Sequence, residues 1–255
     1  MERAATSDME LKDKGEVPSL TTGAVLLAAG ASRRMGGDTS KAMLTLAERT
    51  VLERSAAALL AAPSVTRLVV VTREEDREDM ERCLRARGHR VDAMALGGEE
   101  RTDSVRAGLA AMPPDVDVVL VHDAARCFVH PDDVEAVARA AYEHGASLLA
   151  TRVRDTLKHS ANGLQSEETV DRDRLWAAET PQAMRTARFH DVLARAAADR
   201  FRPTDDAALH EHYHGPTRLV EGRGSNVKIT TPADVVLGEA MARMLDAERE
   251  AEAAR

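Results

Sequence analysis

Short apolar runs alternate with helix-like segments along most of this chain, and this alternation restricts the fold more than any other feature. The apolar runs occupy residues 24–29, 68–71, 91–96, 116–121 and 146–151. Each is about as long as a buried strand. The stretches between them carry helix signals, such as Thr50 as a predicted N-cap and Pro63 just past the helix end. This order predicts an α/β fold, with a Rossmann-like, mostly parallel sheet and helices on both faces.

The regular order breaks between residues 152 and 175, where charged and polar residues predominate. Asn162-Gly163 lies in the middle of this segment and is a strong signal for a β-hairpin turn. We therefore predict a projecting β-hairpin arm over about 152–175. Helices resume near Arg185 and at Asp205. The predicted organisation is a disordered or loosely attached extension over 1–22, a single domain over 23–245 with a closing helix over 234–244, and a helical or disordered tail over 246–255.

Charge and composition exclude several classes of protein. The formal net charge is −8, and the sequence shows no basic stripe of the kind that a nucleic-acid-binding protein displays. No apolar run approaches the roughly 18 residues that a membrane-spanning helix needs. The first twenty residues are polar and unlike a secretory signal, and the two cysteines cannot form a disulfide framework. We therefore expect a cytoplasmic protein without nucleic-acid or membrane partners.

The loop after the first apolar run, within LLAAGASRRMGGDTSK, has the composition of an anion-binding loop. Small residues there let backbone amides approach an anion, and two glycines let Arg34 and Lys41 reach one phosphate chain. The glycine spacing of a dinucleotide-binding loop and the Gly-Lys-Ser/Thr end of a P-loop are both missing. From the loop alone, a solvated turn is an equally good interpretation. The small residues are Ala28, Ala29, Gly30, Ala31 and Ser32.

Two further segments follow strands at the same predicted edge of the sheet. GGEERTDSV (97–105) offers Gly97 and Gly98 for close backbone approach, the cation Arg101, and the Ser104 hydroxyl near a helix start. By itself this segment is better interpreted as an ordinary capped helix. HDAAR (122–126) places Asp123 at the end of the most apolar strand, where a carboxylate is a natural ligand for Mg²⁺. A helix cap is the alternative role for Asp123.

Seven segments occur in the order seen in the 2-C-methyl-D-erythritol 4-phosphate cytidylyltransferase family of the non-mevalonate isoprenoid pathway, which the chain resembles over about residues 23–245. The resemblance implies a glycosyltransferase-A-like nucleotidyltransferase fold and a reaction that joins CTP to 2-C-methyl-D-erythritol 4-phosphate. The products would be 4-diphosphocytidyl-2-C-methyl-D-erythritol and pyrophosphate. The segments are LLAAGASRRMGG…SK, GGEERTDSV, HDAAR, VRDTLK, TVDRDRLWAAETPQ, TDDA and LVEGRGSNVKITTPAD.

The resemblance also implies roles for individual residues. CTP would be bound by the 28–34 loop and by 97–104, with Asp123 holding Mg²⁺ or another divalent cation. The catalytic residues would be Arg34 and Lys41, which stabilise the transition state on the triphosphate, and Arg172 and Lys228, which position the acceptor phosphate. The residues of the acceptor pocket would be Thr156, Thr180 and Thr204, with Arg126 beside them.

The family is a homodimer in which an arm lends residues to the neighbouring site. The resemblance therefore implies a homodimer through the 152–175 arm, with Thr156 and Arg172 acting in trans. Three positions depart from the family pattern, because Ser40, Cys127 and Arg152 stand where proline is common. Ser40 is expected to leave the loop before Lys41 less rigid and to lower turnover.

The implied nucleophile is a phosphate, which explains why the sequence needs no His/Asp base pair. A phosphate monoester with a second pKa of about 6 is mostly dianionic at pH 7. The obstacle is repulsion between this dianion and the triphosphate, about 1 kcal/mol for each unit-charge pair at 4 Å in water and about 4 kcal/mol at an effective dielectric constant near 20. Four cationic side chains and Mg²⁺ suit such a reaction, in which catalysis is positioning and electrostatic stabilisation.

Two rival functions stay open from the sequence. A ribitol-5-phosphate cytidylyltransferase performs the same displacement on a similar acceptor. A catalytically silent nucleotide-binding or assembly domain is the rival from another class, and the retained charged residues argue against it. HEHYH (210–214) is interpreted as a solvated surface rather than a metal site, and Trp176 is expected to pack at the base of the arm.

Overall fold

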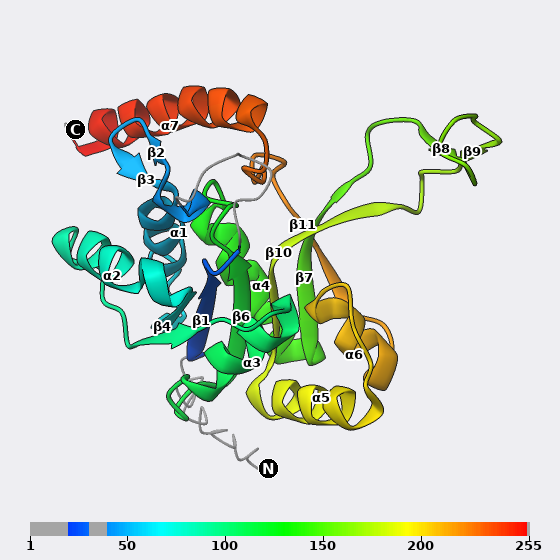
Figure 1. The fold of residues 1–255 in the computed structure, drawn as a ribbon, viewed down its shortest axis with the longest axis horizontal. Helices are drawn as coiled ribbons and strands as arrows, with labels where there is room; N and C mark the ends of the chain where they lie inside the picture. Colours follow the sequence, from blue (N-terminus) through cyan, green and yellow to red (C-terminus); the bar gives the residue numbers. More distant parts are fainter. Residues whose placement is uncertain (1–19, 31–39, 254–255) are drawn as a thin grey trace, which may run out of the picture.

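The computed structural model of the protein describes residues 20–30 and 40–253 (Figure 1). The main sheet consists of β1 (Thr22–Leu27), β4 (Val65–Thr72), β5 (Ala93–Leu96), β6 (Val118–Asp123), β7 (Ala146–Arg152), β10 (Trp176–Arg185) and β11 (Arg218–Glu221). Its strand order is β11-β7-β10-β6-β1-β4-β5. β1 is parallel to β4 and β6, β4 to β5, and β7 to β11, whereas β10 is antiparallel to both of its neighbours. The prediction of a mostly parallel sheet is confirmed.

Helices cover both faces of this sheet, as the sequence predicted (Figure 1). The side chains of β1 alternate between the two faces, so Ala24 and Leu26 pack with α1, α2 and α4, whereas Val25 packs with α3 and α5. The helices are α1 (Val51–Leu60), α2 (Arg77–Ala86), α3 (Arg101–Ala110), α4 (Pro131–His144), α5 (Thr186–Asp199), α6 (Asp206–His214) and α7 (Pro232–Ala253), with short 3₁₀ helices at η2 (Lys41–Met43) and η3 (Glu74–Asp76).

The five predicted strands all form, whereas β10 and β11 have no counterpart in the prediction. β10 pairs with β6 and β7 and lies between them, which makes it the link between the parallel part of the sheet and its outer edge. The predicted N-cap of α1 is confirmed, because the Thr50 hydroxyl accepts from the Glu53 backbone N–H at 3.1 Å. Helix α4 ends at Gly145, whose φ is +95°.

The segment after β7 forms the predicted arm, which projects from the ends of β7 and β10 (Figure 1). Its hairpin pairs β8 (Leu157–His159) with β9 (Glu168–Val170) in antiparallel register. The connecting turn is longer than a two-residue hairpin loop: Gly163 adopts φ +71°, and the Asn162 side chain accepts from the Leu164 backbone N–H at 2.8 Å. Trp176 packs at the base of the arm, as predicted from the sequence. The Arg152 guanidinium lies 4.5 Å from the centre of its ring.

Helix α7 packs over the two-stranded ribbon of β2 (Thr45–Leu46) and β3 (Arg49–Thr50). Helix α7 begins two residues before the predicted closing helix (234–244) and continues to Ala253. Arg54, buried in α1, reaches it through an ion pair with Asp246 at 2.5 Å. Within residues 20–30 and 40–253, no helix is both long and apolar enough to cross a bilayer. Most of the 1–22 extension lies outside the described residues.

Candidate active site

The carboxyl ends of β1, β4, β5 and β6 meet at one edge of the sheet, since these strands run parallel. Asp123 is the last residue of β6. The loop after β1 starts at the same edge, where the Ala28 backbone N–H donates to the Val71 carbonyl at 2.7 Å, and Ala29 and Gly30 follow. Ala31, Ser32 and Arg34 lie outside the described residues.

Asp123 lies between two cations. Its Oδ2 is 2.6 Å from Lys228 Nζ, and its Oδ1 is 3.6 Å from Arg101 Nε. Burial by itself would raise the pKa of this carboxyl group, but Arg101 and Lys228 hold the pKa below its ordinary value of 3.8. Asp123 is therefore ionised at neutral pH. Its side chain keeps 15% exposure, so Asp123 is accessible to a ligand at the edge of the sheet.

Lys41 joins this cluster through the segment that carries Lys228. The Ile229 backbone N–H donates to the Ala125 carbonyl at 2.8 Å and holds the segment beside the loop after β6. Lys41 Nζ donates to the carbonyl of Thr230 at 3.0 Å. Lys41 therefore contacts the short segment that carries Lys228, and the structure brings Lys41, Asp123 and Lys228 to one side of the molecule.

Gly97 and Gly98 lie where a side chain would meet neighbouring atoms of the protein itself. A Cβ on Gly97 would stand 2.5 Å from the Ala29 Cβ, and one on Gly98 would stand 2.3 Å from the Asp103 Cβ. The β5–α3 segment thus packs directly against the start of the loop after β1. The Ser104 hydroxyl is buried and accepts from the Gly98 backbone N–H at 3.3 Å, so it helps to hold this turn.

Arg101 connects α3 to α6. Its Nη2 lies 2.8 Å from Asp206 Oδ2, while its Nε lies near Asp123. Asp206 is 2% exposed, and burial raises its pKa even though Arg101 opposes the shift. Thr204 was the one residue of TDDA (204–207) predicted to have a role, so the role of Asp206 in holding Arg101 was missed. A second acidic residue at a helix start was the available signal.

Thr180 and His122 form a buried pair beside Asp123. Thr180 Oγ1 accepts from the Asp123 backbone N–H at 3.0 Å and lies 3.2 Å from His122 Nδ1. His122 Nε2 lies 3.0 Å from the carbonyl oxygen of Arg126. Burial lowers the pKa of His122 to about 4, so the imidazole is neutral at pH 7. Arg126 itself donates from Nη1 to the Asn226 carbonyl at 2.9 Å.

A second buried network, which the sequence did not reveal, supports the same strands. Asn226 Nδ2 donates to Glu179 Oε2 and to the Thr180 carbonyl, both at 2.8 Å. The Thr151 hydroxyl donates to Glu179 Oε1 at 3.0 Å. These bonds tie β7, β10 and the Lys228 segment together. None of these side chains stands out in a sequence as a functional residue, since each works only through its buried partners.

Three further predicted site residues, Thr156, Arg172 and Thr204, are exposed. Thr156 and Arg172 are on the exposed arm, and Arg172 Nη1 donates to the carbonyl of Arg154. Among the described contacts, the Arg172 side chain meets none of Lys41, Asp123 or Lys228. Thr204 is exposed just before α6. One protomer therefore does not bring its own arm residues together with Asp123.

The histidine-rich segment of α6 differs from its prediction in part. His210 is 2% exposed rather than solvated, because its Nδ1 pairs with the Thr217 hydroxyl at 3.0 Å and its Nε2 faces Arg188 at 3.0 Å. Across residues 20–30 and 40–253, no group of three or more His, Cys, Asp or Glu side chains is arranged to hold a metal ion. A cation at Asp123 would therefore take its other ligands from phosphate oxygens and water.

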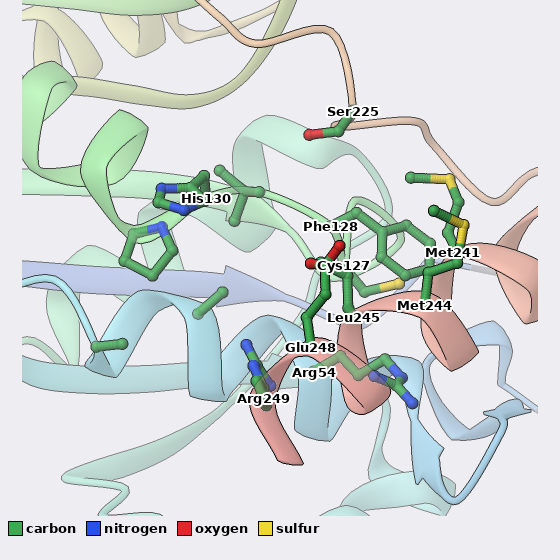
Figure 2. Close-up of a pocket in the computed structure, with 14 residues that line it drawn as sticks. Arg54, Cys127, Phe128, His130, Ser225, Met241, Met244, Leu245, Glu248 and Arg249 are labelled. Carbon is green, nitrogen blue, oxygen red and sulfur yellow. The ribbon is translucent and has the colours of Figure 1, made fainter. Parts of the chain in front are cut away.

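A cavity of about 520 Å³ lies on another part of the molecule, between α1, the 127–131 segment and α7 (Figure 2). Its lining includes Cys127, Phe128, Met241 and Leu245 but no member of the Asp123 cluster. Cys127 is 4% exposed, and burial raises the pKa of its thiol to about 12. This thiol is therefore protonated at neutral pH, and the cavity is separate from the candidate site.

Comparisons with known proteins agree on one family. The family model for 2-C-methyl-D-erythritol 4-phosphate cytidylyltransferase (IspD) matches residues 22–244. The curated protein of that name from Geobacillus kaustophilus (strain HTA426) is 38% identical over 219 residues, which cover 86% of this chain and 95% of the relative. The protein of the same name from Gloeobacter violaceus is 40% identical over 216 residues, covering 84% of this chain and 93% of the relative.

Solved structures give the same result. The 4-diphosphocytidyl-2C-methyl-D-erythritol synthase from Anaerococcus prevotii DSM 20548 superimposes with a TM-score of 0.77 at 25% identity, covering 88% of this chain and 97% of that structure. The 2-C-methyl-D-erythritol 4-phosphate cytidylyltransferase from Thermus thermophilus has a TM-score of 0.72 at 31% identity, covering 88% of this chain and 100% of that structure.

Proposed function

Because this chain belongs to the 2-C-methyl-D-erythritol 4-phosphate cytidylyltransferase family, we propose that its Asp123 site converts CTP and 2-C-methyl-D-erythritol 4-phosphate to 4-diphosphocytidyl-2-C-methyl-D-erythritol and pyrophosphate. The observation that carries this proposal is the position of Asp123 between Arg101 and Lys228 at the carboxyl edge of a parallel sheet, with Lys41 bound to the segment that carries Lys228. Such an edge is where open α/β sheets bind nucleotides.

The reaction needs cations rather than a base. An oxygen of the acceptor phosphate attacks the α-phosphorus of CTP, and the bond from that phosphorus to the α–β bridging oxygen breaks as pyrophosphate leaves. The attacking phosphate is already mostly ionised at pH 7, so no proton has to be removed. Lys41 is proposed to stabilise the charge that develops on the triphosphate, together with Arg34. Lys228, whose side chain is 44% exposed, is proposed to hold the acceptor phosphate.

The other proposed contacts divide between the two substrates. CTP is proposed to bind the loop after β1 and the β5–α3 segment, which pack against each other at Ala29 and Gly97. The acceptor is proposed to contact Arg126, Thr156, Arg172, Thr180 and Thr204. The residues proposed for CTP are Ala28, Ala29, Gly30, Ala31, Ser32, Gly97, Gly98, Arg101 and Ser104.

The chemistry of Asp123 fits a divalent cation. Its carboxylate is ionised, partly exposed, and engaged more loosely at Oδ1 than at Oδ2. Mg²⁺ takes one or two carboxylates and keeps water and phosphate ligands, so a single aspartate suffices. When bound, the ion would reduce the negative charge of the triphosphate. Mg²⁺ dependence is accordingly part of the proposal.

A homodimer is proposed because the arm carries two acceptor residues but presents them away from the site of its own protomer. Leu164 near the arm tip is 88% exposed, and Leu157 in β8 is 36% exposed, as suits a segment that packs on a partner. In this arrangement Thr156 and Arg172 complete the neighbouring site. A cytoplasmic location is proposed because both cysteines of the chain are free thiols.

The test is an acceptor screen with the purified full-length protein, CTP and Mg²⁺, in which pyrophosphate release is measured. We expect release with 2-C-methyl-D-erythritol 4-phosphate, little release with ribitol 5-phosphate, and none without an acceptor. Preference for ribitol 5-phosphate would establish the rival cytidylyltransferase. Absence of turnover with both acceptors, in protein that still binds CTP, would establish a catalytically silent domain.

A further inference from the structure

The segment that carries Lys228 has no helix or strand to fix its position. Residues 222–230 connect β11 to α7 without regular secondary structure. Close to Lys228 the segment is anchored on both sides. The Ile229 backbone N–H donates to the Ala125 carbonyl at 2.8 Å, and the Asn226 side chain, 4% exposed, lies among buried partners. Lys228 lies between these anchors, so their geometry determines where its amine can reach.

The orientation of the Asn226 amide is determined by its neighbours. Its Nδ2 donates to Glu179 Oε2 and to the Thr180 carbonyl oxygen, both at 2.8 Å. The other carboxyl oxygen of Glu179 accepts from the Thr151 hydroxyl at 3.0 Å. Both protons of the amide nitrogen are therefore used, and an amide oxygen turned toward the same two acceptors would be repelled. Asn226 is held in one orientation by β10.

This network is not completely paired. Among the described residues, Asn226 Oδ1 and Arg126 Nε are buried without a hydrogen-bond partner. Buried polar atoms that lack partners reduce stability. Asn226 is thus poorly suited to a purely structural role, and its two Nδ2 bonds are the part of the side chain that organises the site.

The backbone of Asn226 contacts the site as well. Its carbonyl accepts from Arg126 Nη1 at 2.9 Å. Two positions further along the chain, Lys228 Nζ lies 2.6 Å from Asp123 Oδ2. A displacement of Asn226 would therefore change the placement of both Arg126 and Lys228, which are proposed to hold the acceptor.

We propose that Glu179 and Asn226 are positioning residues, whose buried hydrogen bond places Arg126 and Lys228 for the acceptor. The inference rests on the proposed cytidylyltransferase function of the same site. Neither side chain has to touch a substrate in this role, since Glu179 is 8% exposed and Asn226 is 4% exposed. The role agrees with a contact between Thr180 and the acceptor, because Asn226 bonds to the carbonyl of Thr180 and not to its hydroxyl.

Asn226→Asp exchanges a nitrogen for an oxygen at almost constant shape and tests the bond directly. The new oxygen would face two acceptors, so the segment should shift. We expect KM for the acceptor to rise about tenfold or more and kcat to fall roughly 10- to 100-fold, the loss that misplacement of reacting groups by about 1 Å can cause. CTP affinity, measured by calorimetry, should stay within about twofold, because the hydrogen bonds of Asn226 do not reach the CTP segments.

A purely structural role predicts a different result. The thermal midpoint of Asn226→Asp would fall, while kcat and KM of the folded protein would stay within about twofold of the wild type. That outcome would overturn the proposal.

Two variants of Glu179 test the acceptor of the bond. Glu179→Gln keeps an oxygen for Asn226 and turns its nitrogen to the Thr151 hydroxyl, which can accept, so activity should stay within about threefold. Glu179→Leu has a similar size but no acceptor, and KM for the acceptor substrate should rise about fivefold or more. Equal activity of the two variants would contradict the positioning role. Glu78→Gln, at an exposed glutamate of α2, is the matched control.

The double variant Asn226→Asp/Glu179→Gln has the net charge of the wild type. The glutamine nitrogen can donate to the aspartate oxygen, so the bond re-forms with its polarity reversed. Its kcat/KM for the acceptor should exceed that of Asn226→Asp by about fivefold or more, with partial recovery because the Thr180 carbonyl still faces an oxygen. Effects that simply multiply would show that the two residues do not act as a pair. If Asn226→Asp fails to fold, the double variant and the Glu179 variants decide the question.

The contact can also be measured without turnover. Urea unfolding of the wild type, Asn226→Asp, Glu179→Gln and the double variant forms the same cycle, and Asn226→Asp should be the least stable of the four. Coupling in unfolding, combined with no cytidylyl transfer by the wild type, would disprove the proposed function and leave the contact established. Turnover by the wild type without coupling in either unfolding or kinetics would overturn the positioning role.

Discussion

Lys228 Nζ lies 2.6 Å from Asp123 Oδ2, although 105 positions separate the two residues. The backbone bond from Ile229 to Ala125 sets this contact, because it holds the two segments side by side. The same segment accepts a hydrogen bond from Lys41 through the carbonyl of Thr230. The charged cluster is thus assembled by the sheet edge and its loops.

Replacement of Lys41 by alanine should lower kcat on the order of 10²–10³-fold, the loss typical of one preorganised charge-stabilising group. The thermal midpoint should change little, since Lys41 is only half-buried and lies in the short 3₁₀ helix η2. Steady-state kinetics with both substrates would measure the effect. Arg82→Ala, at an exposed cation of α2, is the control. A near-normal kcat in Lys41→Ala would remove this residue from the mechanism.

Arg172→Ala should mainly damage use of the acceptor, while CTP affinity measured by calorimetry survives. If the arm acts in trans, mixing Arg172→Ala with Lys41→Ala protomers should restore about a quarter of wild-type activity, because half of the dimers are mixed and each has one intact site. Refolding the two variants together and assaying turnover would test this. Equal activity in mixed and separate samples would show that Arg172 serves its own protomer.

The pH profile of kcat/KM for the acceptor should have an acidic limb near pH 6, where the acceptor phosphate takes up its second proton. Asp123 does not produce this limb, because Arg101 and Lys228 hold its pKa below 3.8. Its interaction with these cations is present above the unfolded pKa and is lost only as the pH falls through the lower folded value. Comparison with a ³¹P titration of the free acceptor is the check, and a limb at a different pH would assign it to the protein.

Ser40→Pro should stabilise the protein. Ser40 has φ −59°, which proline adopts, and its hydroxyl is buried without a partner among the described atoms. The carbonyl that accepts from the Met43 N–H at 2.9 Å is retained. We expect the free energy of unfolding to rise by about 0.5–1 kcal/mol, with kcat equal to or above that of the natural protein. Ser40→Ala separates loss of the hydroxyl from restriction of the backbone, and a lower thermal midpoint for the proline variant would contradict the prediction.

Asp246→Ala should destabilise the fold by roughly 2 kcal/mol, below the 3–5 kcal/mol typical of a fully buried pair because Asp246 is 21% exposed. The loss arises because Arg54, 4% exposed, keeps its charge without this partner. Urea unfolding would measure it, with Arg243→Ala on the exposed side of α7 as the control. Arg54→Met combined with Asp246→Ala should recover part of the loss. No change in Asp246→Ala would show that the end of α7 does not anchor the helix.

Local patterns predicted the elements whose signals are contained within a few residues. The apolar runs of β1, β4 and β6 formed as expected because burial on both faces requires a continuous apolar sequence. The Thr50 cap and the arm around Gly163 were recognisable for the same local reason. β10 was missed because its WAAETPQAMR sequence carries no apolar run, and its place between β6 and β7 depends on pairing with strands far away in the chain.

Strand periodicity and the order of the motifs are properties of the linear chain, so they were enough to establish the fold class, the family and the segments that contain the charged residues. Only the folded molecule shows which side chains contact one another. Folding joined Arg101 to Asp206, placed His122 between Thr180 and the Arg126 carbonyl, and set Arg172 on an arm away from Asp123. The physical reason is that hydrogen bonds and ion pairs depend on distances of a few ångströms between residues that can be more than a hundred positions apart, and the packing of the sheet and its loops sets those distances.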